Sequence, residues 1–168
     1  MSAKTSLQIA ILTISDTRTI DTDTSGGYLV TAVEADGHQV YERSIVKDNI
    51  YQLREIVSRW IADENIHCVV TTGGTGFTPA DVTPEAIKPL FDKDVDGFGE
   101  LFRAQSFETI GTSTIQSRVF AGFANQTVIF CLPGSTGACK DGWKLIAPQL
   151  DSNNRPCNFV EHITKKHQ

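Results

Sequence analysis

The order of short apolar runs and amphipathic segments is the feature that most limits how this chain can fold. Strands are predicted at four apolar runs, residues 8–15, 38–46, 66–72 and 127–132. Helices are predicted between the first three runs, at 24–36 and 49–62, because apolar residues recur there at helical spacing. This succession of strands and helices is typical of right-handed crossovers in a parallel sheet. We therefore predict an α/β fold, a single three-layer domain with a mostly parallel sheet flanked by helices.

Local signals predict the rest of the chain. Three further helices are expected at residues 84–91, 98–107 and 137–150. Thr83 is the expected N-cap of the first of these helices, and Pro84 takes its first position. Residues 111–124 carry ambiguous signals, with a helix over 114–120 as one solution. The last stretch, 151–168, is expected to be an irregular tail.

The composition excludes several classes of protein. The 168 residues suit one domain with a full core. The formal net charge of −5 argues against a nucleic-acid partner, which would call for a basic face. No apolar run is long enough to cross a bilayer, and residues 1–7 lack the layout of a secretory signal, so we expect a cytoplasmic protein without a membrane partner. Cys68 and Cys131 lie in apolar runs and are expected to be reduced core residues.

Three loops that could carry chemistry directly follow predicted strands. They are Ser15 with Asp16, the cluster of Gly73, Gly74, Thr75 and Gly76, and the turn of Pro133, Gly134 and Ser135. Ligands bind at the carboxyl ends of the strands in open α/β sheets, so these loops are expected to share a site. Exposed amides in a glycine turn bind anions, which predicts a phosphate together with a divalent metal. The alternative is that the glycine loops are plain turns.

Acidic residues near these loops are the candidate metal ligands. Asp81 follows the glycine cluster, so it is either a metal ligand or an ordinary turn residue ahead of a helix. Asp48 directly precedes the helix at 49–62, so from the residues alone an ordinary N-cap is its better explanation, with a metal ligand as the alternative. Glu100 and Arg103 follow a glycine-flanked helix start, where they form either a surface pair or part of a segment that lines a pocket.

Four short motifs, in order along the chain, resemble those of the MogA/MoaB family of molybdenum cofactor biosynthesis proteins. They are residues 71–76 (TTGGTG), 81–86 (DVTPEA), 97–100 (GFGE) and 132–135 (LPGS). The resemblance extends over most of the chain, from residue 7 to residue 150. Residues 111–118 and 155–159 are similar to the MoaB branch in particular.

The resemblance implies one molybdopterin-binding domain over residues 1–168 and a nucleotidyl transfer. Active members of the family transfer AMP from ATP to the terminal phosphate of molybdopterin, release pyrophosphate and use Mg²⁺. Asp48 and Asp81 match the two acids that this catalysis requires, and they are the implied Mg²⁺ ligands. The positions that match nucleotide- and phosphate-binding residues are Gly73, Gly74, Thr75, Gly76, Pro133, Gly134 and Ser135. Those that match the pterin pocket are Ser15, Asp16, Glu100 and Arg103.

One departure keeps a second function open. Many members of the family carry an arginine before the acid of the DVTPEA motif, where this chain has Ala80. Loss of that charge could weaken the handling of ATP or pyrophosphate. The alternative is therefore a non-catalytic molybdopterin-binding or scaffold protein of the same pathway.

The resemblance also implies partners. Besides molybdopterin and ATP, these are the metal-inserting enzyme of the pathway and further copies of the chain, as a trimer or a hexamer. Apolar residues in 111–123 and in the tail support an oligomer, and Phe159 and Ile163 are expected to be buried against a neighbouring subunit. The alternative is that the tail folds back on its own domain.

Overall fold

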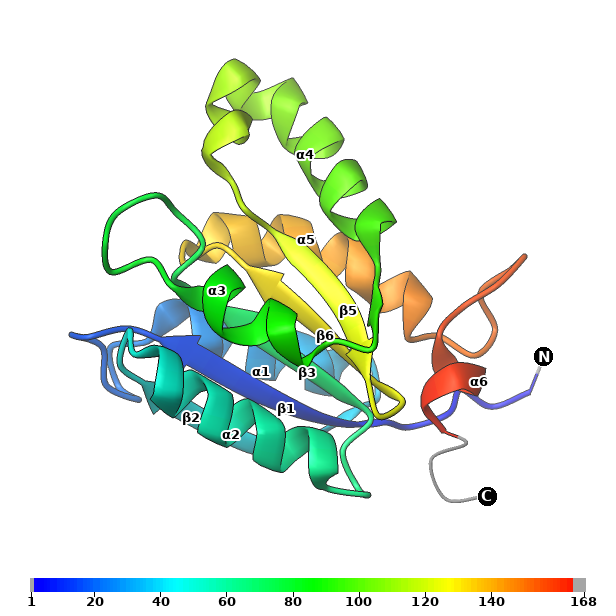
Figure 1. Ribbon diagram of the computed structural model, residues 1–168. Helices are drawn as coiled ribbons and strands as arrows, with labels where there is room; N and C mark the ends of the chain where they lie inside the picture. Colours follow the sequence, from blue (N-terminus) through cyan, green and yellow to red (C-terminus); the bar gives the residue numbers. More distant parts are fainter. Residues whose placement is uncertain (1, 165–168) are drawn as a thin grey trace.

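The four apolar runs all form strands, and these strands lie side by side in parallel at the centre of the fold (Figure 1). The computed structural model describes residues 2–164. The strands are β1 (Gln8–Ile14), β2 (Gln39–Val46), β3 (Cys68–Thr72), β4 (Lys93–Asp94), β5 (Phe120–Ala124) and β6 (Thr127–Leu132). They form one six-stranded sheet in the order β2-β1-β3-β6-β5-β4. The pairs that β5 makes with β6 and β4 are antiparallel and the other three pairs are parallel, so the predicted mostly parallel sheet is confirmed.

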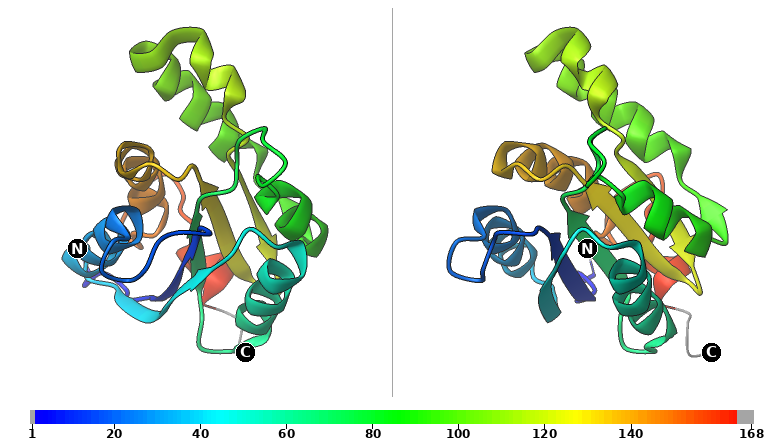
Figure 2. Two further views of the ribbon diagram at one scale, coloured as in Figure 1. Left: turned by 90° about the vertical axis from the view of Figure 1, so that its left-hand side faces the viewer. Right: turned by 60° about the vertical axis from the view of Figure 1, so that its left-hand side comes forward.

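Helices cover both faces of the sheet, which gives the predicted three layers (Figure 2). They are α1 (Thr24–Ala35), α2 (Ile50–Ala62), α3 (Thr83–Ile87) with the 3-10 helix η1 (Lys88–Leu90), and α5 (Thr136–Gln149). Side chains of β1 alternate between two apolar clusters: Ile9 and Ile11 pack with α1 and α5, whereas Ala10 and Leu12 pack with α2 and α3. Because both faces are covered, the central strands β3 and β6 are buried along their whole length.

The start of α2 corrects one expectation. The N-cap of this helix is Asn49, whose side chain accepts hydrogen bonds from the amides of Tyr51 and Gln52 at 2.9 and 3.0 Å. Asp48 is therefore not the cap. The neighbouring residue satisfies the open amides of the first turn, which leaves the Asp48 carboxylate available for another role.

Residues 96–116 form an arm that projects beyond the rest of the molecule (Figure 1). The arm consists of α4 (Asp96–Ile110) and the 3-10 helix η2 (Gly111–Gln116). Its large exposed apolar side chains are Leu101, Phe107, Ile110 and Ile115. The predicted helix over 114–120 is wrong, because η2 ends at Gln116 and the chain enters β5 at Phe120.

The tail folds back on its own domain. The short helix α6 (Val160–Ile163) buries Val160 and Ile163 in the cluster that holds α1 and α5. Phe159 packs against Phe123 with ring centroids 5.2 Å apart. Ile163 is wholly buried in its own domain, so the expectation that it faces a neighbouring subunit is wrong, whereas for the half-buried Phe159 it stays a prediction. Part of the predicted irregular tail, residues 165–168, lies outside the described residues.

No helix within residues 2–164 combines the length and the apolar character needed to cross a membrane. The predicted core cysteines, Cys68 and Cys131, are buried free thiols.

Candidate functional site

A cleft of about 840 Å³ lies at the carboxyl ends of β1, β3 and β6. The structure brings eleven of the thirteen predicted site residues to its lining, namely Ser15, Asp16, Asp48, Asp81, the loop at 73–76 and the turn at 133–135. The arm forms the opposite wall through Phe102, Ser106, Thr109 and Ile110. Sequence reasoning did not name these arm residues, because on the same helix it selected Glu100 and Arg103 instead.

The glycine cluster after β3 needs its glycines. Gly73 and Gly74 have φ values of +109° and +72°, which other residues rarely adopt. A Cβ atom on Gly73 would lie 2.3 Å from the carbonyl oxygen of Ile14, and one on Gly74 would lie 2.2 Å from Thr83 Oγ1. Thr83 also fixes this loop, because its hydroxyl donates to the Gly73 carbonyl at 2.8 Å and its amide donates to the Gly74 carbonyl at 3.0 Å.

This use of Thr83 corrects a second expected helix cap. The N-cap of α3 is Val82, and no side chain caps the helix there. The hydroxyl that sequence reasoning assigned to capping α3 instead holds the glycine loop against the helix.

The amides of this loop remain open to a ligand. Its first carbonyls are held by Thr83, but among residues 2–164 no acceptor pairs with the amides of Gly74 and Thr75. Neighbouring unpaired amides in a loop with positive φ values form an anion-binding nest. The loop can therefore bind a phosphate through its backbone.

The turn after β6 has the same character and lies against the first loop. The Pro133 carbonyl accepts from Thr72 Oγ1, and the Gly134 carbonyl accepts from Ser25 Oγ, both at 2.8 Å. Ser135 caps α5 by accepting from the amide of Ala138, whereas no acceptor within residues 2–164 pairs with the amides of Gly134 and Ser135. A Cβ on Gly134 would lie 3.5 Å from Gly73 Cα, so the two sets of open amides adjoin.

The loop after β1 connects Asp16 to Asp48. Ser15 Oγ accepts from the amides of Thr17 and Arg18 at 3.2 and 3.1 Å, which closes a tight turn. Asp16 Oδ1 then accepts from the amide of Asp48 at 3.1 Å. This bond places the segment between β2 and α2 beside the end of β1.

Asp48 and Asp81 differ in their electrostatic surroundings. Burial, together with the negative charges of Asp16 and Asp81, raises the pKa of Asp48. Burial alone would also raise the pKa of Asp81, but hydrogen bonds from Thr78 and from the Gly76 amide, with the charge of Arg118, lower it instead. Asp81 is thus held by its own loop, whereas Asp48 is a carboxylate beside like charges.

Such an arrangement is suited to a cation shared with a ligand. Within residues 2–164, no three His, Cys, Asp or Glu side chains come close enough to hold a metal by themselves. Mg²⁺ commonly binds through one or two carboxylates and completes its shell with phosphate oxygens and water. Asp48 and Asp81 could hold a cation in this way if a phosphate occupied the neighbouring amides.

Glu100 and Arg103 lie outside the lining of this cleft. Arg103 Nη1 donates to the carbonyls of Ser117 and Val119 at 3.3 and 3.0 Å and crosses closely over Gly99. Glu100 is exposed on the arm. The structure therefore accounts for Arg103 as a link between α4 and the segment before β5, and a pterin-binding role of the two residues stays a prediction.

Comparisons with known proteins show the family of this chain. The family model described as "Probable molybdopterin binding domain" matches residues 10–152. Molybdenum cofactor biosynthesis protein B of Escherichia coli K12 is 55% identical over 159 residues, which cover 94% of each chain.

Solved structures show the same relationship. A crystal structure of a molybdenum cofactor biosynthesis protein B superposes with a TM-score of 0.87 at 40% identity and covers 98% of each chain. The tungsten cofactor synthesizing protein MoaB from Pyrococcus furiosus gives 0.80 at 32% identity, covering 96% of this chain and 99% of that one. The chain belongs to the MogA/MoaB family of molybdenum cofactor biosynthesis proteins.

Proposed function

We propose that this protein is a molybdopterin adenylyltransferase, which transfers AMP from ATP to the terminal phosphate of molybdopterin and releases pyrophosphate. The observation that supports this best is the pair of adjoining loops with open amides at Gly74, Thr75, Gly134 and Ser135. Two such loops can bind two phosphate groups next to each other. The family membership supplies the pterin and the pathway.

In the proposed reaction, a terminal phosphate oxygen of molybdopterin attacks the α-phosphorus of ATP. The bond from that phosphorus to the bridging oxygen breaks, and pyrophosphate leaves with the electron pair. The attacking group is already an anion, so no side chain has to remove a proton. What the protein supplies is alignment of the two anions and fixed amide donors for the charge that develops on the phosphate oxygens.

The lining of the cleft explains why a divalent cation is part of the proposal. Among the described residues that line the cleft, Arg18 is the only lysine or arginine, and its Nη1 donates to the Thr22 carbonyl at 2.7 Å. Asp48 and Asp81 fit Mg²⁺ as the carboxylate part of its shell, and Mg²⁺ would neutralise phosphate charge when bound.

The direct test is pyrophosphate release from ATP and Mg²⁺, measured with and without molybdopterin. We expect release that depends on molybdopterin, together with an adenylylated pterin detected by mass spectrometry. Binding of molybdopterin without any pyrophosphate release would instead identify the non-catalytic binding protein. The metal-inserting enzyme of the pathway is the expected recipient of the product.

We also propose that the chain forms a trimer or a hexamer through the arm rather than through the tail. Leu101, Phe107, Ile110 and Ile115 are between 52% and 73% exposed, which is unusual for large apolar side chains gathered on one projecting element. Burial against another copy would remove this surface from water.

Sedimentation at micromolar concentration tests the assembly. The double variant Leu101→Ser and Phe107→Ser should shift the mass towards the monomer, because both side chains lie on α4. Tyr51→Ser is a matched control, since Tyr51 is 77% exposed on α2, away from the arm. A monomeric wild-type protein, or an unchanged oligomer in the double variant, would contradict the proposal.

A further inference from the structure

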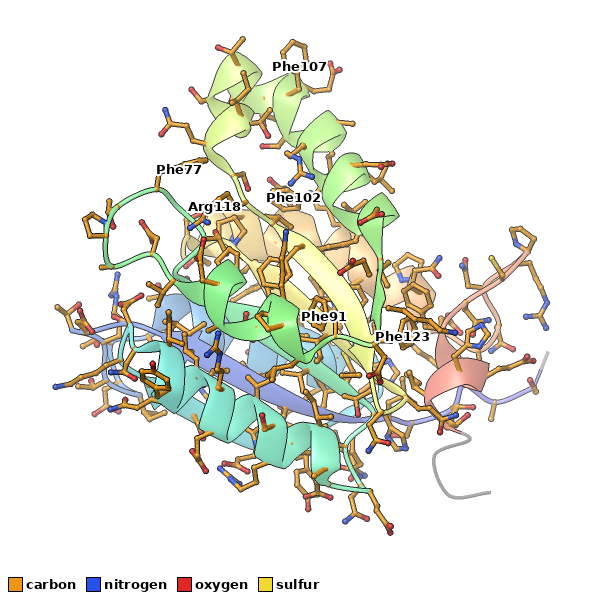
Figure 3. The ribbon with its side chains drawn as sticks, viewed as in Figure 1. Phe77, Phe91, Phe102, Phe107, Arg118 and Phe123 are labelled. Atoms are coloured by element: carbon orange, nitrogen blue, oxygen red, sulfur yellow. The ribbon has the colours of Figure 1, made fainter. Side chains whose placement is uncertain are left out.

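Arg118 lies between η2 and β5 and reaches across to the loop that carries Asp81 (Figure 3). Its backbone amide donates to the Thr75 carbonyl at 3.2 Å. Its Nε and Nη2 both donate to the Gly76 carbonyl, at 2.9 and 2.7 Å, and Nη2 also donates to the Asp81 carbonyl at 3.0 Å. A single residue thus holds both ends of the segment 76–81.

The remaining contacts of Arg118 extend this attachment. Nη1 forms an ion pair with the carboxylate of Glu85, in the first turn of α3. The guanidinium also lies over the ring of Phe77, 5.1 Å from its centroid. These bonds use the planar donor fork of arginine, which the single ammonium of lysine cannot reproduce.

The segment has few other attachments to the body of the protein. Residues 77–80 are all exposed, so the apolar core does not fix them. Inside the segment, the amide and hydroxyl of Thr78 donate to Asp81 Oδ2 at 2.9 and 2.7 Å, which makes Phe77 to Asp81 a small unit of its own. The position of this unit relative to Asp48 and the open amides therefore depends on the bonds that Arg118 makes at its two ends.

We propose that Arg118 is a positioning residue: it fixes the loop at 76–81 and thereby places the Asp81 carboxylate for cation and phosphate binding. This inference rests on the proposed function, because it concerns the same cleft. Residues that orient a metal ligand from behind typically change metal affinity or activity by about 10- to 100-fold when they are replaced.

The first measurement is Mn²⁺ affinity, determined by electron paramagnetic resonance in the presence of α,β-methylene-ATP, which cannot lose pyrophosphate. We expect Arg118→Gln to weaken Mn²⁺ binding by about tenfold or more. Arg118→Lys, which retains the charge but not the fork, should fall between Arg118→Gln and the wild type.

Arg54→Gln is the matched control. Arg54 Nε donates to the Ala86 carbonyl at 3.1 Å and its Nη2 donates to the Glu85 carbonyl at 3.0 Å. Arg54, like Arg118, is therefore attached to α3, in its case through backbone carbonyls, but it bonds neither Gly76 nor Asp81. We expect it to lower the melting temperature in the same range as the Arg118 variants while leaving Mn²⁺ affinity unchanged.

Hydrogen–deuterium exchange of the peptide over residues 76–82 gives a second measurement that needs no ligand. Exchange should be faster in both Arg118 variants than in the wild type and in Arg54→Gln. Wild-type Mn²⁺ affinity and slow exchange in Arg118→Gln would overturn the proposal. If Arg118→Gln does not fold, Arg118→Lys decides in the same way.

The two proposals can fail separately. If the wild-type protein binds Mn²⁺ with the ATP analogue but never releases pyrophosphate from ATP and molybdopterin, the adenylyltransferase proposal fails. A weaker Mn²⁺ affinity in the Arg118 variants would still establish the positioning role.

Discussion

Backbone amides are paired with side chains at one end of the parallel sheet and are unpaired at the other. At the amino end, side-chain acceptors pair with the amides that lead into β1: His38 Nδ1 accepts from Leu7 at 3.2 Å, and His67 Nδ1 accepts from Gln8 at 2.9 Å. At the carboxyl end, the amides of Gly74 and Gly134 have no acceptor among residues 2–164. We call the amino end, where side chains of the protein bond these amides, the closed end, and the carboxyl end, where the amides are unpaired, the open end.

The two ends of the sheet therefore differ in role: the paired amides at the amino end contribute to stability, whereas the unpaired amides at the carboxyl end are available to a ligand. An unpaired backbone amide is costly when it is shielded from water, so most proteins pair nearly all of them. Gly134 is exposed and Gly74 is half-buried, so water can bond their amides, and a ligand at this end of the sheet, where α/β proteins bind ligands, could replace that water. The carbonyls of the same loops are bonded to Thr83, Arg118 and Ser25, which shows that the loops are ordered rather than loosely held.

The largest expected effect at the open end is that of Asp48→Asn. We expect adenylyl transfer to fall by on the order of a thousandfold, about 4 kcal/mol, because a neutral amide is a poor Mg²⁺ ligand. The melting temperature without Mg²⁺ should rise, because the pKa of Asp48 is raised and its charge at neutral pH therefore opposes folding.

Two measurements decide this prediction, turnover with saturating ATP and thermal unfolding without metal. Asp94→Asn, at an exposed position outside the cleft, is the control and should change neither. Near-normal turnover in a folded Asp48→Asn protein would remove Asp48 from the catalytic residues. The helix α2 should be unaffected, since Asn49 remains its cap.

Asp81→Asn should also reduce turnover, by about a hundredfold, but with the opposite effect on stability. The pKa of Asp81 is lowered, so its carboxylate contributes stability that is present above the unfolded pKa and is lost as the pH falls through the folded value. At neutral pH the Asn variant should therefore melt earlier than the wild type. Equal shifts in melting temperature for Asp48→Asn and Asp81→Asn would contradict the distinction between a free acid and one held by its loop.

Gly134→Val tests whether the open amides bind phosphate. A Cβ on Gly134 makes only an ordinary contact, 3.5 Å from Gly73 Cα, so folding should change by less than about 1 kcal/mol. The side chain would occupy the space next to both sets of amides, and we expect calorimetric titration to show ATP–Mg²⁺ affinity reduced by about tenfold.

Substitutions at two other glycines help to interpret this experiment. Gly97→Ala is the control, because no atom lies within 4 Å of its added Cβ and it is outside the cleft. Gly74→Val is a poorer probe, since the clash with Thr83 Oγ1 and the positive φ would damage folding together with binding. Unchanged affinity in Gly134→Val would mean that phosphate does not bind at these loops.

Local signals were enough to predict the parallel half of the fold. β1, β3 and α2 carry strong periodic or apolar patterns, and the loops that follow such strands meet at one end by topology alone. The two-residue strand β4 and the strand β5 were missed, because their strand character comes from pairing with distant residues such as those of β6. That pairing is not visible in the sequence near 114–124.

Prediction of the site is limited in the same way, because contacts between distant residues are not visible in the sequence. Asp48 and Asn49 are both good N-cap residues, and only the position at which the helix begins assigns the cap to Asn49. Arg118 lies 42 positions after Gly76, so no spacing in the sequence links it to the glycine loop. Glu100 belongs to the motif at 97–100, and Arg103 follows it. Phe98 of the same motif packs in the core, with its ring centroid 5.0 Å from that of Phe130, which gives part of the motif a structural reason.

The smallest expected effect lies at the closed end of the sheet, at His38. Burial first, and then the charge of Lys4, lower the pKa of His38, against a partial opposing effect of Asp36 and Asp151. Because Nδ1 accepts from the Leu7 amide, the neutral ring carries its proton on Nε2, a buried nitrogen with no partner among residues 2–164.

Protonation of His38 would therefore break the bond to Leu7 and place a charge in a buried position. The folded protein binds fewer protons than the unfolded chain once the pH drops below about 6.5, so the free energy of unfolding should fall as the pH falls from there towards the lowered pKa. The slope that one histidine can contribute is at most about 1.4 kcal/mol per pH unit.

Urea unfolding between pH 7.5 and 5 should show this slope in the wild type, and His38→Gln should flatten it because Gln can accept from Leu7 without titrating. His162→Gln, the same substitution at an exposed histidine, is the matched control. ATP–Mg²⁺ affinity at pH 7.5 should be the same in all three proteins, and a loss of affinity in His38→Gln would show that the two ends of the sheet are not independent.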